Sequence, residues 1–451
     1  MTRTLDLIVI GSGSAAGSVA SRCRAAGWTV AMIDQRPFGG TCALRGCDPK
    51  KVLVGATSAV DAARALSGKG VRPDGLAIDW TELMKFKRTF TDPVPESRKA
   101  SLARAGIETY QDVARFVGPS HIAVGDTTLE ATRAIVIAAG AKPANLAIPG
   151  SERLLTSDDF LELSSLPASL AFIGGGYISF EFAHVAARAG SRVTILHRGQ
   201  RPLVRFDPDL VERLVRRTCD LGINVRLGAE VQGIESVGTL CRTTFRDTRG
   251  DATVDADRVV HGAGRVPDLQ ELNLDAAGVQ YSRDGVRVND YLQSVSNPKV
   301  YAAGDCAATG GPPLTPVAGY EGRIVAANLL EGNHERADYT AVPSVVFTIP
   351  PLARVGLTED EAGARGMRFT VRHEETSTWY SSRRVGEEAS AFKVLVEEDT
   401  GRLLGAHLLG PHADETINLF ALAMRAGIPA DRFKQMLWSY PTHASDTAYM
   451  V

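Results

Sequence analysis

The chain has 451 residues, more than one ordinary hydrophobic core accommodates, so we expect two to four domains. It is 44% hydrophobic and 23% charged, as globular proteins are, and its net charge of −2 excludes the strongly basic classes that bind nucleic acid or anionic membranes. The sequence enters an apolar strand at once, with no signal peptide or membrane-spanning stretch, which predicts a cytoplasmic protein.

The first predicted unit is a buried strand at residues 6–10, a glycine turn, a helix and a second strand that ends on Asp34. The turn has the pattern G-x-G-x-x-A. Gly11 permits the tight turn, Gly13 lets the backbone approach a pyrophosphate, and Ala16 lets helix and strand pack closely. Asp34 stands where a carboxylate accepts hydrogen bonds from ribose hydroxyls. This unit therefore predicts a dinucleotide site.

Two cysteines follow in the segment GGTCALRGCDPKK. We expect Cys42 and Cys47 at the start of one helix, where the sulfurs are within reach of a disulfide and the helix amino end lowers a thiol pKa. The alternatives are two buried core thiols or half of a zinc site, but zinc needs four ligands and no second ligand pair lies nearby. The pattern favours a redox pair. The other cysteines stand singly and are expected to be buried: Cys23, Cys219, Cys241 and Cys306.

The first unit recurs later in the chain. A strand at 170–173 precedes Gly174, Gly176 and Ser179, and a second strand ends before His197. The spacing from Gly174 to His197 equals that from Gly11 to Asp34. A lone glycine triplet is a weak signal, but two in matched settings predict two bound dinucleotides. Three further apolar strands end in glycine turns, which contain Gly140, Gly264 and the pair Gly304–Asp305.

The composition changes from residue 341 onwards. Period-two strands and loops replace the glycine turns, and residues 415–427 form an amphipathic helical pattern. No glycine fingerprint occurs in this stretch. It therefore predicts a third domain of the α+β class.

Taken together, these motifs resemble the flavoprotein disulfide reductase family, which includes glutathione reductase, dihydrolipoamide dehydrogenase and mercuric reductase. The matching segments run in the family's order over nearly the whole chain: 11–17, 39–51, 174–183, 301–307, 314–318 and 345–359. The resemblance implies two Rossmann-like three-layer domains, the first discontinuous, and an α+β dimerisation domain of a homodimer. The implied boundaries are 1–150 and 269–336 for the FAD domain, 151–268 for the NAD(P)H domain and 337–451 for the interface domain.

The resemblance also implies roles for single residues. Cys42 is expected to attack the substrate, and Cys47 to face the flavin as a charge-transfer thiolate. Lys50 and Glu181 are expected to form an ion pair beside the flavin N5, and Tyr177 to be the gate that admits the nicotinamide. Outside this context such residues are more often solvated charges or core aromatics. The residues expected to bind FAD are Gly11, Gly13, Ala16, Asp34, Gly40, Thr41, Lys51, Gly140 and Asp305. Those expected to bind NADPH are Gly174, Gly176, Tyr177, Ser179, Arg198, Arg205 and Gly264.

The residues after the second nucleotide strand indicate which pyridine nucleotide binds. An NADH site has a carboxylate at the end of this strand, to accept from the 2′-hydroxyl. Here the position is His197, followed by Arg198, Arg201 and Arg205. Guanidinium groups suit a 2′-phosphate, so NADPH is favoured over NADH, and the alternative is a solvated basic loop.

The carboxy-terminal motif departs from the family. Disulfide-reducing members carry His-Pro-Thr-x-x-Glu there, and the His shuttles protons to the substrate thiol. In this chain Tyr440 replaces the His and Ser445 the Glu, and His443, oriented by Asp446, is a candidate replacement base or a plain surface histidine.

The expected reaction is transfer of electrons from NADPH through FAD and the Cys42–Cys47 disulfide to a small disulfide or another thiol-reactive acceptor. The departure at the carboxy terminus leaves alternatives open within and outside the enzymes. One is a reductase of metal ions, of the mercuric type, or of quinones. Another is a redox protein that delivers electrons to a protein partner. No resident metal is expected.

Overall fold

The computed structural model describes residues 2–451, which form two compact units. The first comprises Met1–Lys50, Phe86–Ala144 and Arg265–Tyr339, and the second comprises Lys51–Lys85, Asn145–Gly264 and Thr340–Val451. Helices α3 (Cys47–Ala65) and α4 (Trp80–Thr91) pass from one unit's sequence into the other's. Within residues 2–451, no helix combines the length and the apolar character that a membrane crossing requires.

The first unit is built on a sheet whose strand β1 (Thr2–Ile10) lies at the centre. Strand β1 is flanked in parallel by β2 (Val30–Ile33) and β6 (Thr127–Ile137), and its last four residues are fully or almost fully buried. Such an apolar run is typical of a parallel strand that is covered on both faces. The sheet continues with β3 (Glu108–Tyr110), β4 (Ala114–Gly118), β5 (His121–Val124) and β19 (Val300–Ala302).

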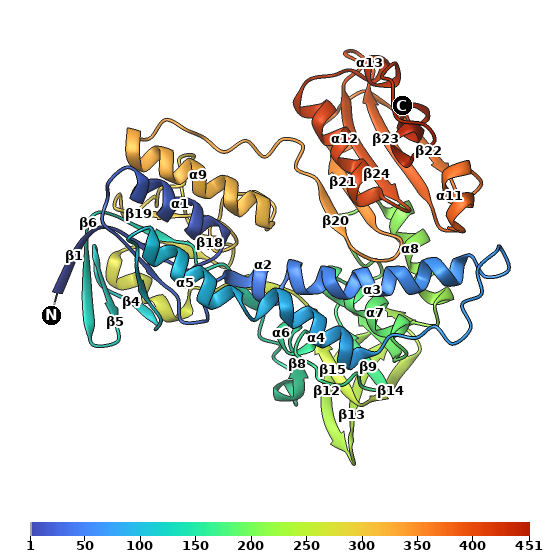
Figure 1. The fold of residues 1–451 in the computed structure, drawn as a ribbon, viewed down its shortest axis with the longest axis horizontal. Coiled ribbons are helices and arrows are strands. Elements are labelled where there is room, and N and C mark those ends of the chain that lie inside the picture. The colour runs from blue at the N-terminus through green and yellow to red at the C-terminus, as the bar shows by residue number, and fades with distance from the viewer. Residues whose placement is uncertain (1) are drawn as a thin grey trace. The chain divides into compact units, whose positions relative to one another are not determined.

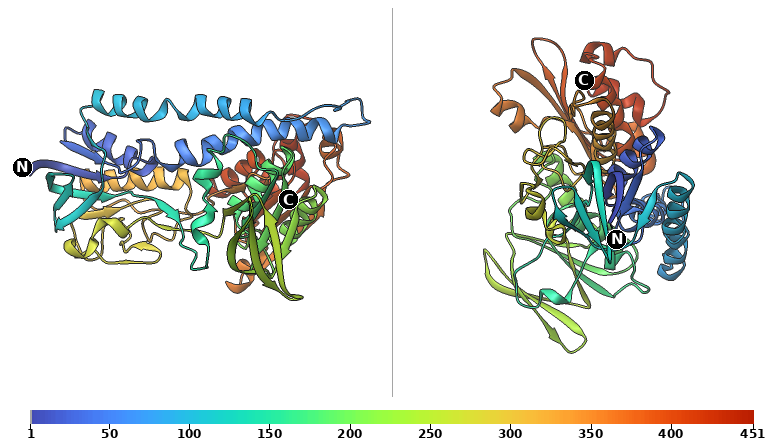
Figure 2. Two further views of the ribbon diagram at one scale, coloured as in Figure 1. Left: turned by 90° about the horizontal axis from the view of Figure 1, so that it is seen from below. Right: turned by 90° about the vertical axis from the view of Figure 1, so that its left-hand side faces the viewer.

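Each face of this sheet has its own core. Helices α1 (Ser14–Ala25) and α9 (Thr315–Glu331) lie side by side over one face (Figures 1 and 2). On the other face, apolar side chains of the parallel strands pack with those of the sheet's own β4–β5 hairpin and of residues 269–286, which gives three layers. The remaining elements of the unit are α2 (Gly40–Arg45), α5 (Val94–Arg104), β7 (Ala141–Pro143), β16 (Arg265–Pro267), β17 (Tyr281–Ser282) and β18 (Gly285–Val286).

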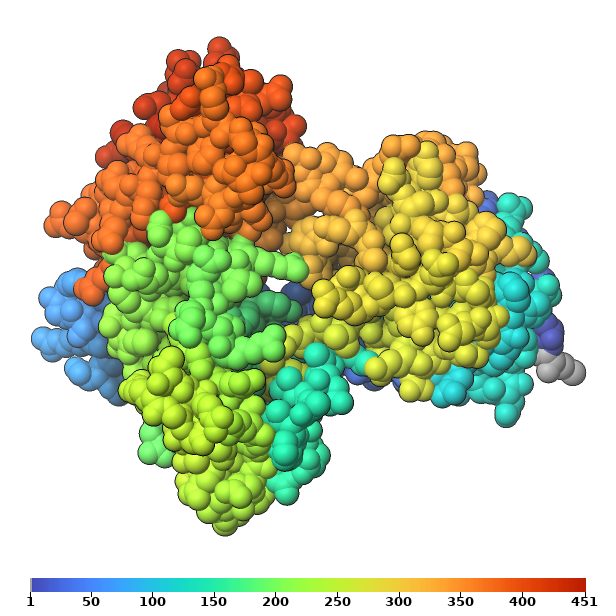
Figure 3. Space-filling model, turned by 180° about the vertical axis from the view of Figure 1, so that it is seen from behind, coloured from blue at the N-terminus to red at the C-terminus, as the bar shows by residue number. Residues whose placement is uncertain are grey.

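The second unit repeats this architecture. Its parallel sheet has the order β11-β10-β9-β15-β8, with helices α7 (Tyr177–Arg188) and α8 (Pro208–Asp220) packed on one face. A three-stranded antiparallel sheet packs on the other face, and Figure 3 shows its surface in yellow-green. The bounds are β8 (Leu154–Leu155), α6 (Ser157–Phe160), β9 (Ser169–Ile173), β10 (Arg192–His197), β11 (Asn224–Leu227), β12 (Glu230–Val237), β13 (Leu240–Asp247), β14 (Gly250–Ala256) and β15 (Arg258–His261).

The second unit ends in an antiparallel sheet of order β20-β21-β24-β23-β22. Helix α12 (Ala413–Arg425) packs on this sheet through Ile417, Phe420 and other apolar side chains. The bounds are β20 (Ser344–Val346), β21 (Leu352–Gly356), α10 (Glu359–Ala364), β22 (Phe369–Glu375), α11 (Tyr380–Val385), β23 (Ala391–Glu397), β24 (Leu403–Leu409), α13 (Ala430–Lys434) and α14 (His443–Asp446).

The predicted fold class is therefore confirmed: two three-layer nucleotide-binding domains, the first discontinuous, and an α+β domain. The prediction that all four single cysteines are buried is wrong for two of them. Cys23 and Cys306 are buried, but Cys219 is exposed and Cys241 partly exposed. Helix α8 buries Leu214 and Thr218, so the side chain next to Thr218 points outwards.

Candidate functional site

The first glycine turn leaves room for a phosphate at the start of α1. Gly11 has a φ of +109°, and a Cβ there would lie 2.2 Å from the carbonyl oxygen of Ala138. Gly13 is the N-cap of α1, and no side chain caps the helix. A Cβ on Gly40, which has a φ of +73°, would lie 2.5 Å from the Cα of Gly13. Gly13 and Gly40 thus let the cysteine-bearing segment approach the uncapped end of α1. The free N–H groups at this helix end form a cradle that fits the pyrophosphate of FAD.

Asp34 is held at the end of β2 by its neighbours. Its Oδ2 accepts a hydrogen bond of 2.6 Å from the Ser12 hydroxyl, and its Oδ1 accepts one of 2.9 Å from the backbone N–H of Arg36. The Ser12 oxygen in turn accepts from the N–H of Gly39 at 3.0 Å. The partly exposed carboxylate is fixed in place and retains lone pairs for a ribose hydroxyl.

The two cysteines occupy different helices, so the prediction that one helix starts with both is wrong. Cys42 lies in the short helix α2, and Cys47 is the first residue of α3. Gly46 lies between the two helices. A glycine is required there, because a Cβ would lie 2.9 Å from the carbonyl oxygen of Thr41. This break turns the chain back and brings the two sulfurs into hydrogen-bonding contact as free thiols.

The contact polarises the pair. The hydrogen bond from Cys42 lowers the pKa of Cys47 to about 6, and the same bond raises that of Cys42. The Thr315 hydroxyl, 3.4 Å from the Cys47 sulfur, and the charge of Lys50 lower the pKa of Cys47 further. Surrounding protein atoms oppose them by partly desolvating the sulfur, although Cys47 as a residue is exposed. The contact therefore favours the thiolate on Cys47 and the protonated thiol on Cys42.

A buried carboxylate that the sequence did not single out fixes the loop after β19. Glu321 on α9 is 1% exposed and accepts hydrogen bonds from the N–H of Gly304 at 2.6 Å and from the hydroxyls of Thr309 and Tyr339, each at 2.7 Å. This loop carries Asp305, whose pKa is raised by burial. The only available signal was an acid among apolar helix residues.

The second glycine turn repeats the first. Gly174 has a φ of +114°, and a Cβ there would lie 2.4 Å from the carbonyl oxygen of Gly262. Gly176 is the N-cap of α7, again without a capping side chain, and Tyr177 follows with half of its surface exposed. Gly264, at the end of the third strand of this site, also has a positive φ. The oxygen of Ser179 is buried and has no hydrogen-bond partner within residues 2–451. The turn fits a second dinucleotide.

The basic segment after β10 presents its arginines to solvent. His197 packs over the turn, where a Cβ on Gly175 would meet its ring at 2.5 Å, and its Nε2–H donates to the carbonyl of Arg201 at 3.0 Å. Arg198 and Arg205 are exposed. The carbonyl of Arg205 accepts a hydrogen bond from the guanidinium of Arg354, which fixes the backbone and leaves the Arg205 side chain available for a phosphate.

Two predictions about lysines are not tested by the structure: the ion pair of Lys50 with Glu181, and the contact of Lys51 with FAD. Lys50, 8% exposed, belongs to the first unit, whereas Glu181, 3% exposed, belongs to the second and accepts from the N–H of Phe347 at 2.7 Å. Their ion pair stays a prediction. Lys51 lies 3.5 Å from a carboxylate oxygen of Asp414 and 3.9 Å from the Phe347 ring centre, and its role with FAD also stays a prediction.

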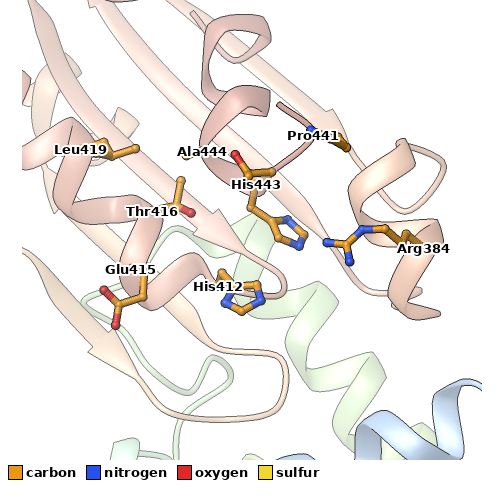
Figure 4. A pocket seen from close by; sticks show the side chains of 9 residues that line it. Arg384, His412, Glu415, Thr416, Leu419, Pro441, His443 and Ala444 are labelled. Carbon is orange, nitrogen blue, oxygen red and sulfur yellow. The ribbon is translucent and has the colours of Figure 1, made fainter. Parts of the chain in front are cut away.

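The carboxy-terminal motif lines a pocket in the second unit (Figure 4). Tyr440 is 80% exposed, while His443 points into the pocket towards His412. Burial lowers the pKa of His443 to about 4, with smaller contributions from His412 and Arg384. Ser445, which replaces the family's Glu, forms a reciprocal capping box with Thr442 at the start of α14.

Asp446 has other partners than His443. It accepts a hydrogen bond from Ser381 and lies near Arg384, and burial raises its pKa. We expected Asp446 to orient His443, but the groups that act on this carboxyl are Ser381 and Arg384. Within residues 2–451, no group of three or more His, Cys, Asp or Glu side chains is placed to hold a metal ion.

Comparisons with known proteins agree with this geometry. Residues 5–322 match the model of the family "Pyridine nucleotide-disulphide oxidoreductase", and residues 342–450 match its dimerisation domain. A mercuric reductase of Lysinibacillus sphaericus is 32% identical over 97% of this chain and 80% of its own length. A glutathione reductase of Burkholderia cepacia is 32% identical over 98% of this chain and 97% of its own.

A solved structure extends the comparison to three dimensions. The Cu(II) complex of RclA, an HOCl-induced flavoprotein disulfide reductase from Escherichia coli, superposes with a TM-score of 0.88, at 28% identity and 99% coverage of both chains. With two nucleotide turns, a polarised cysteine pair and a matching dimerisation domain, this chain belongs to the pyridine nucleotide-disulphide oxidoreductase family of FAD-dependent enzymes that use NAD(P)H as electron donor.

Proposed function

We propose that this enzyme passes electrons from NADPH through FAD and the Cys42–Cys47 pair to a small disulfide or another thiol-reactive acceptor. Bound FAD supplies the two-electron step between the pyridine nucleotide and the disulfide. The single observation that carries the proposal is the contact of the two sulfurs, with the Thr315 hydroxyl 3.4 Å from that of Cys47, an arrangement that lowers the pKa of Cys47 and raises that of Cys42. Cys47 is the sulfur that faces the flavin, and Cys42 is the sulfur that attacks the acceptor.

The flavin and nucleotide residues predicted from the sequence support this proposal through their geometry. The turn at Gly11 and Gly13 and the fixed carboxylate of Asp34 suit FAD. The exposed guanidiniums of Arg198 and Arg205 suit the 2′-phosphate of NADPH rather than the free 2′-hydroxyl of NADH. We further propose the domain boundaries 1–150 with 269–336, 151–268 and 337–451, and a homodimer formed through the last of these.

A second candidate acceptor is a thiophilic metal ion. Reduction of a disulfide releases a thiolate that needs a proton. In this chain Tyr440, a poor base, occupies the position of the family's His, and His443 points into a separate pocket. A metal ion held by thiolates needs no such proton. The relatives named a mercuric reductase and a Cu(II) complex of a disulfide reductase also favour this candidate.

An acceptor panel tests the proposal. The FAD-loaded enzyme is assayed for NADPH oxidation with glutathione disulfide, mercuric ion, cupric ion and a quinone, beside the variants Cys42→Ser and Cys47→Ser. The exposed Cys219 provides the matched control, Cys219→Ser. We expect turnover with a disulfide or a metal ion that both active-site variants abolish and the control retains. Turnover with only the quinone, unaffected by either active-site variant, would refute the proposal.

A further inference from the structure

A cavity of about 440 Å³ opens beside the start of α12, and the predicted roles of the cysteines and nucleotides do not use it. Its lining includes Arg384, His412, Thr416, Thr442 and His443. Figure 4 shows His443 pointing towards His412, with the guanidinium of Arg384 reaching the same space from α11. The two imidazole rings are 5.0 Å apart between their centres and inclined by 43°.

One polar atom in this cavity is left unsatisfied by the protein. The Nε2 of His443 is buried and has no hydrogen-bond partner within residues 2–451. A buried ring nitrogen without a partner costs free energy, because it has lost its hydrogen bond to water and gained none in exchange. A ligand that enters the cavity and accepts a hydrogen bond from this nitrogen removes that cost.

We propose that this cavity is a binding site for an oxyanion, the carboxylate or tetrahedral anionic group of a small molecule. The guanidinium of Arg384 supplies the permanent charge and a planar set of donors. His443 donates from Nε2, and the hydroxyls of Thr416 and Thr442 are further donors in the lining. The proposal does not depend on the identity of the electron acceptor.

The charges around the cavity favour an anion over a cation. Arg384 repels a metal ion, and no third ligand joins the two imidazoles within residues 2–451. Two acids are near. The carboxylate of Glu415 points away from His443 and Arg384 in Figure 4, and Asp446 accepts from Ser381.

Protonation strengthens the proposed site. In the free protein, burial and the neighbouring His412 and Arg384 keep His443 neutral by lowering its pKa to about 4. A bound anion opposes these effects and raises that pKa, so binding takes up a proton as the pH falls. Affinity is therefore expected to increase as the pH falls from 8 to 6, and burial of Asp446, which raises the pKa of its carboxyl, acts in the same sense.

Calorimetric titration of the FAD-loaded enzyme with acetate and with sulfate tests the proposal. Neither anion changes its charge between pH 6 and 8, so the pH dependence reports the protein. The variants are Arg384→Gln and His443→Gln, and the matched control is Arg383→Gln, which alters the exposed neighbouring residue outside the lining. Binding of acetate alone indicates a carboxylate ligand, binding of sulfate alone indicates a tetrahedral one, and binding of both indicates a site that accepts either group.

We expect saturable binding that tightens at lower pH, weakens about tenfold or more in Arg384→Gln and is unchanged in Arg383→Gln. His443→Gln should abolish most of the pH dependence. Absence of saturable binding by either anion, or equal affinities for Arg384→Gln and Arg383→Gln, would overturn the assignment.

Discussion

Lys393 on β23 holds together three acids, and its replacement by Gln should destabilise the second unit. The Lys393 side chain is 3% exposed, and its ammonium lies 2.9 Å from Asp207, 2.5 Å from Asp209 and 3.2 Å from Glu359. Asp207 is fully buried and caps α8 by accepting from the N–H groups of Asp209 and Leu210. The substitution Lys393→Gln would leave this carboxylate buried without its countercharge.

The magnitude follows from burial. Removing one partner of a buried ion pair costs about 3–5 kcal/mol, because the other charge remains desolvated. Asp209 and Glu359 are half exposed, so water compensates them and Asp207 dominates the loss. The assay is denaturant unfolding of the FAD-loaded enzyme at a fixed protomer concentration, followed by circular dichroism. The matched control is Arg246→Gln, which breaks the exposed pair with Asp251 and should leave the midpoint essentially unchanged.

The pH dependence gives this prediction a sign. Hydrogen bonding to Lys393 lowers the pKa of Asp209, so the stabilisation is present above the unfolded-state pKa and is lost as the pH falls through the folded-state pKa. The part of the difference between Lys393→Gln and the wild type that comes from Asp209 should therefore be present at neutral pH and shrink below about pH 4. Equal midpoints for Lys393→Gln and Arg246→Gln at pH 7 would refute the reasoning.

Three further predictions concern the reaction. NADPH should exceed NADH in kcat/KM by about 100-fold, and replacing Arg198 and Arg205 by Ala should remove most of that ratio; equal use of both nucleotides by the wild type would contradict it. Tyr440→Phe should slow the acceptor reaction in steady-state assays and leave stopped-flow flavin reduction by NADPH unchanged, whereas full activity would show that the residue only packs. In the reduced enzyme the Cys47 thiolate signal should fade with a midpoint near pH 6, the thiolate being lost as the pH falls; a midpoint near the ordinary thiol pKa would show an unperturbed thiol.

The repeated nucleotide units were predictable because glycines are sterically required where they occur. Gly11 and Gly174 adopt positive φ next to a carbonyl oxygen that a Cβ would strike. The backbone conformation therefore permits only glycine at these two positions. The apolar strands were predictable for the same kind of reason. Their residues are buried on both faces of a parallel sheet, which permits little except Val, Ile, Leu and Ala.

Features that depend on tertiary contacts were not predictable. The break at Gly46 reads in sequence as an ordinary helix glycine, and only the approach of the chain to Thr41 shows why no side chain fits. Glu321 and Lys393 are buried charges whose partners are mostly distant in sequence, so local pattern gives them no meaning. Cys219 was misjudged because a lone cysteine carries no information about which helix face it occupies.

The central claim is that Cys47 is the thiolate through which electrons pass between flavin and acceptor. Anaerobic titration of the FAD-loaded enzyme with NADPH, followed by absorption spectroscopy, tests it most directly. We predict a long-wavelength thiolate-to-flavin band in the two-electron-reduced enzyme, which Cys47→Ser abolishes and which Cys42→Ser shows without any reductant. A band that persists in Cys47→Ser would contradict the account.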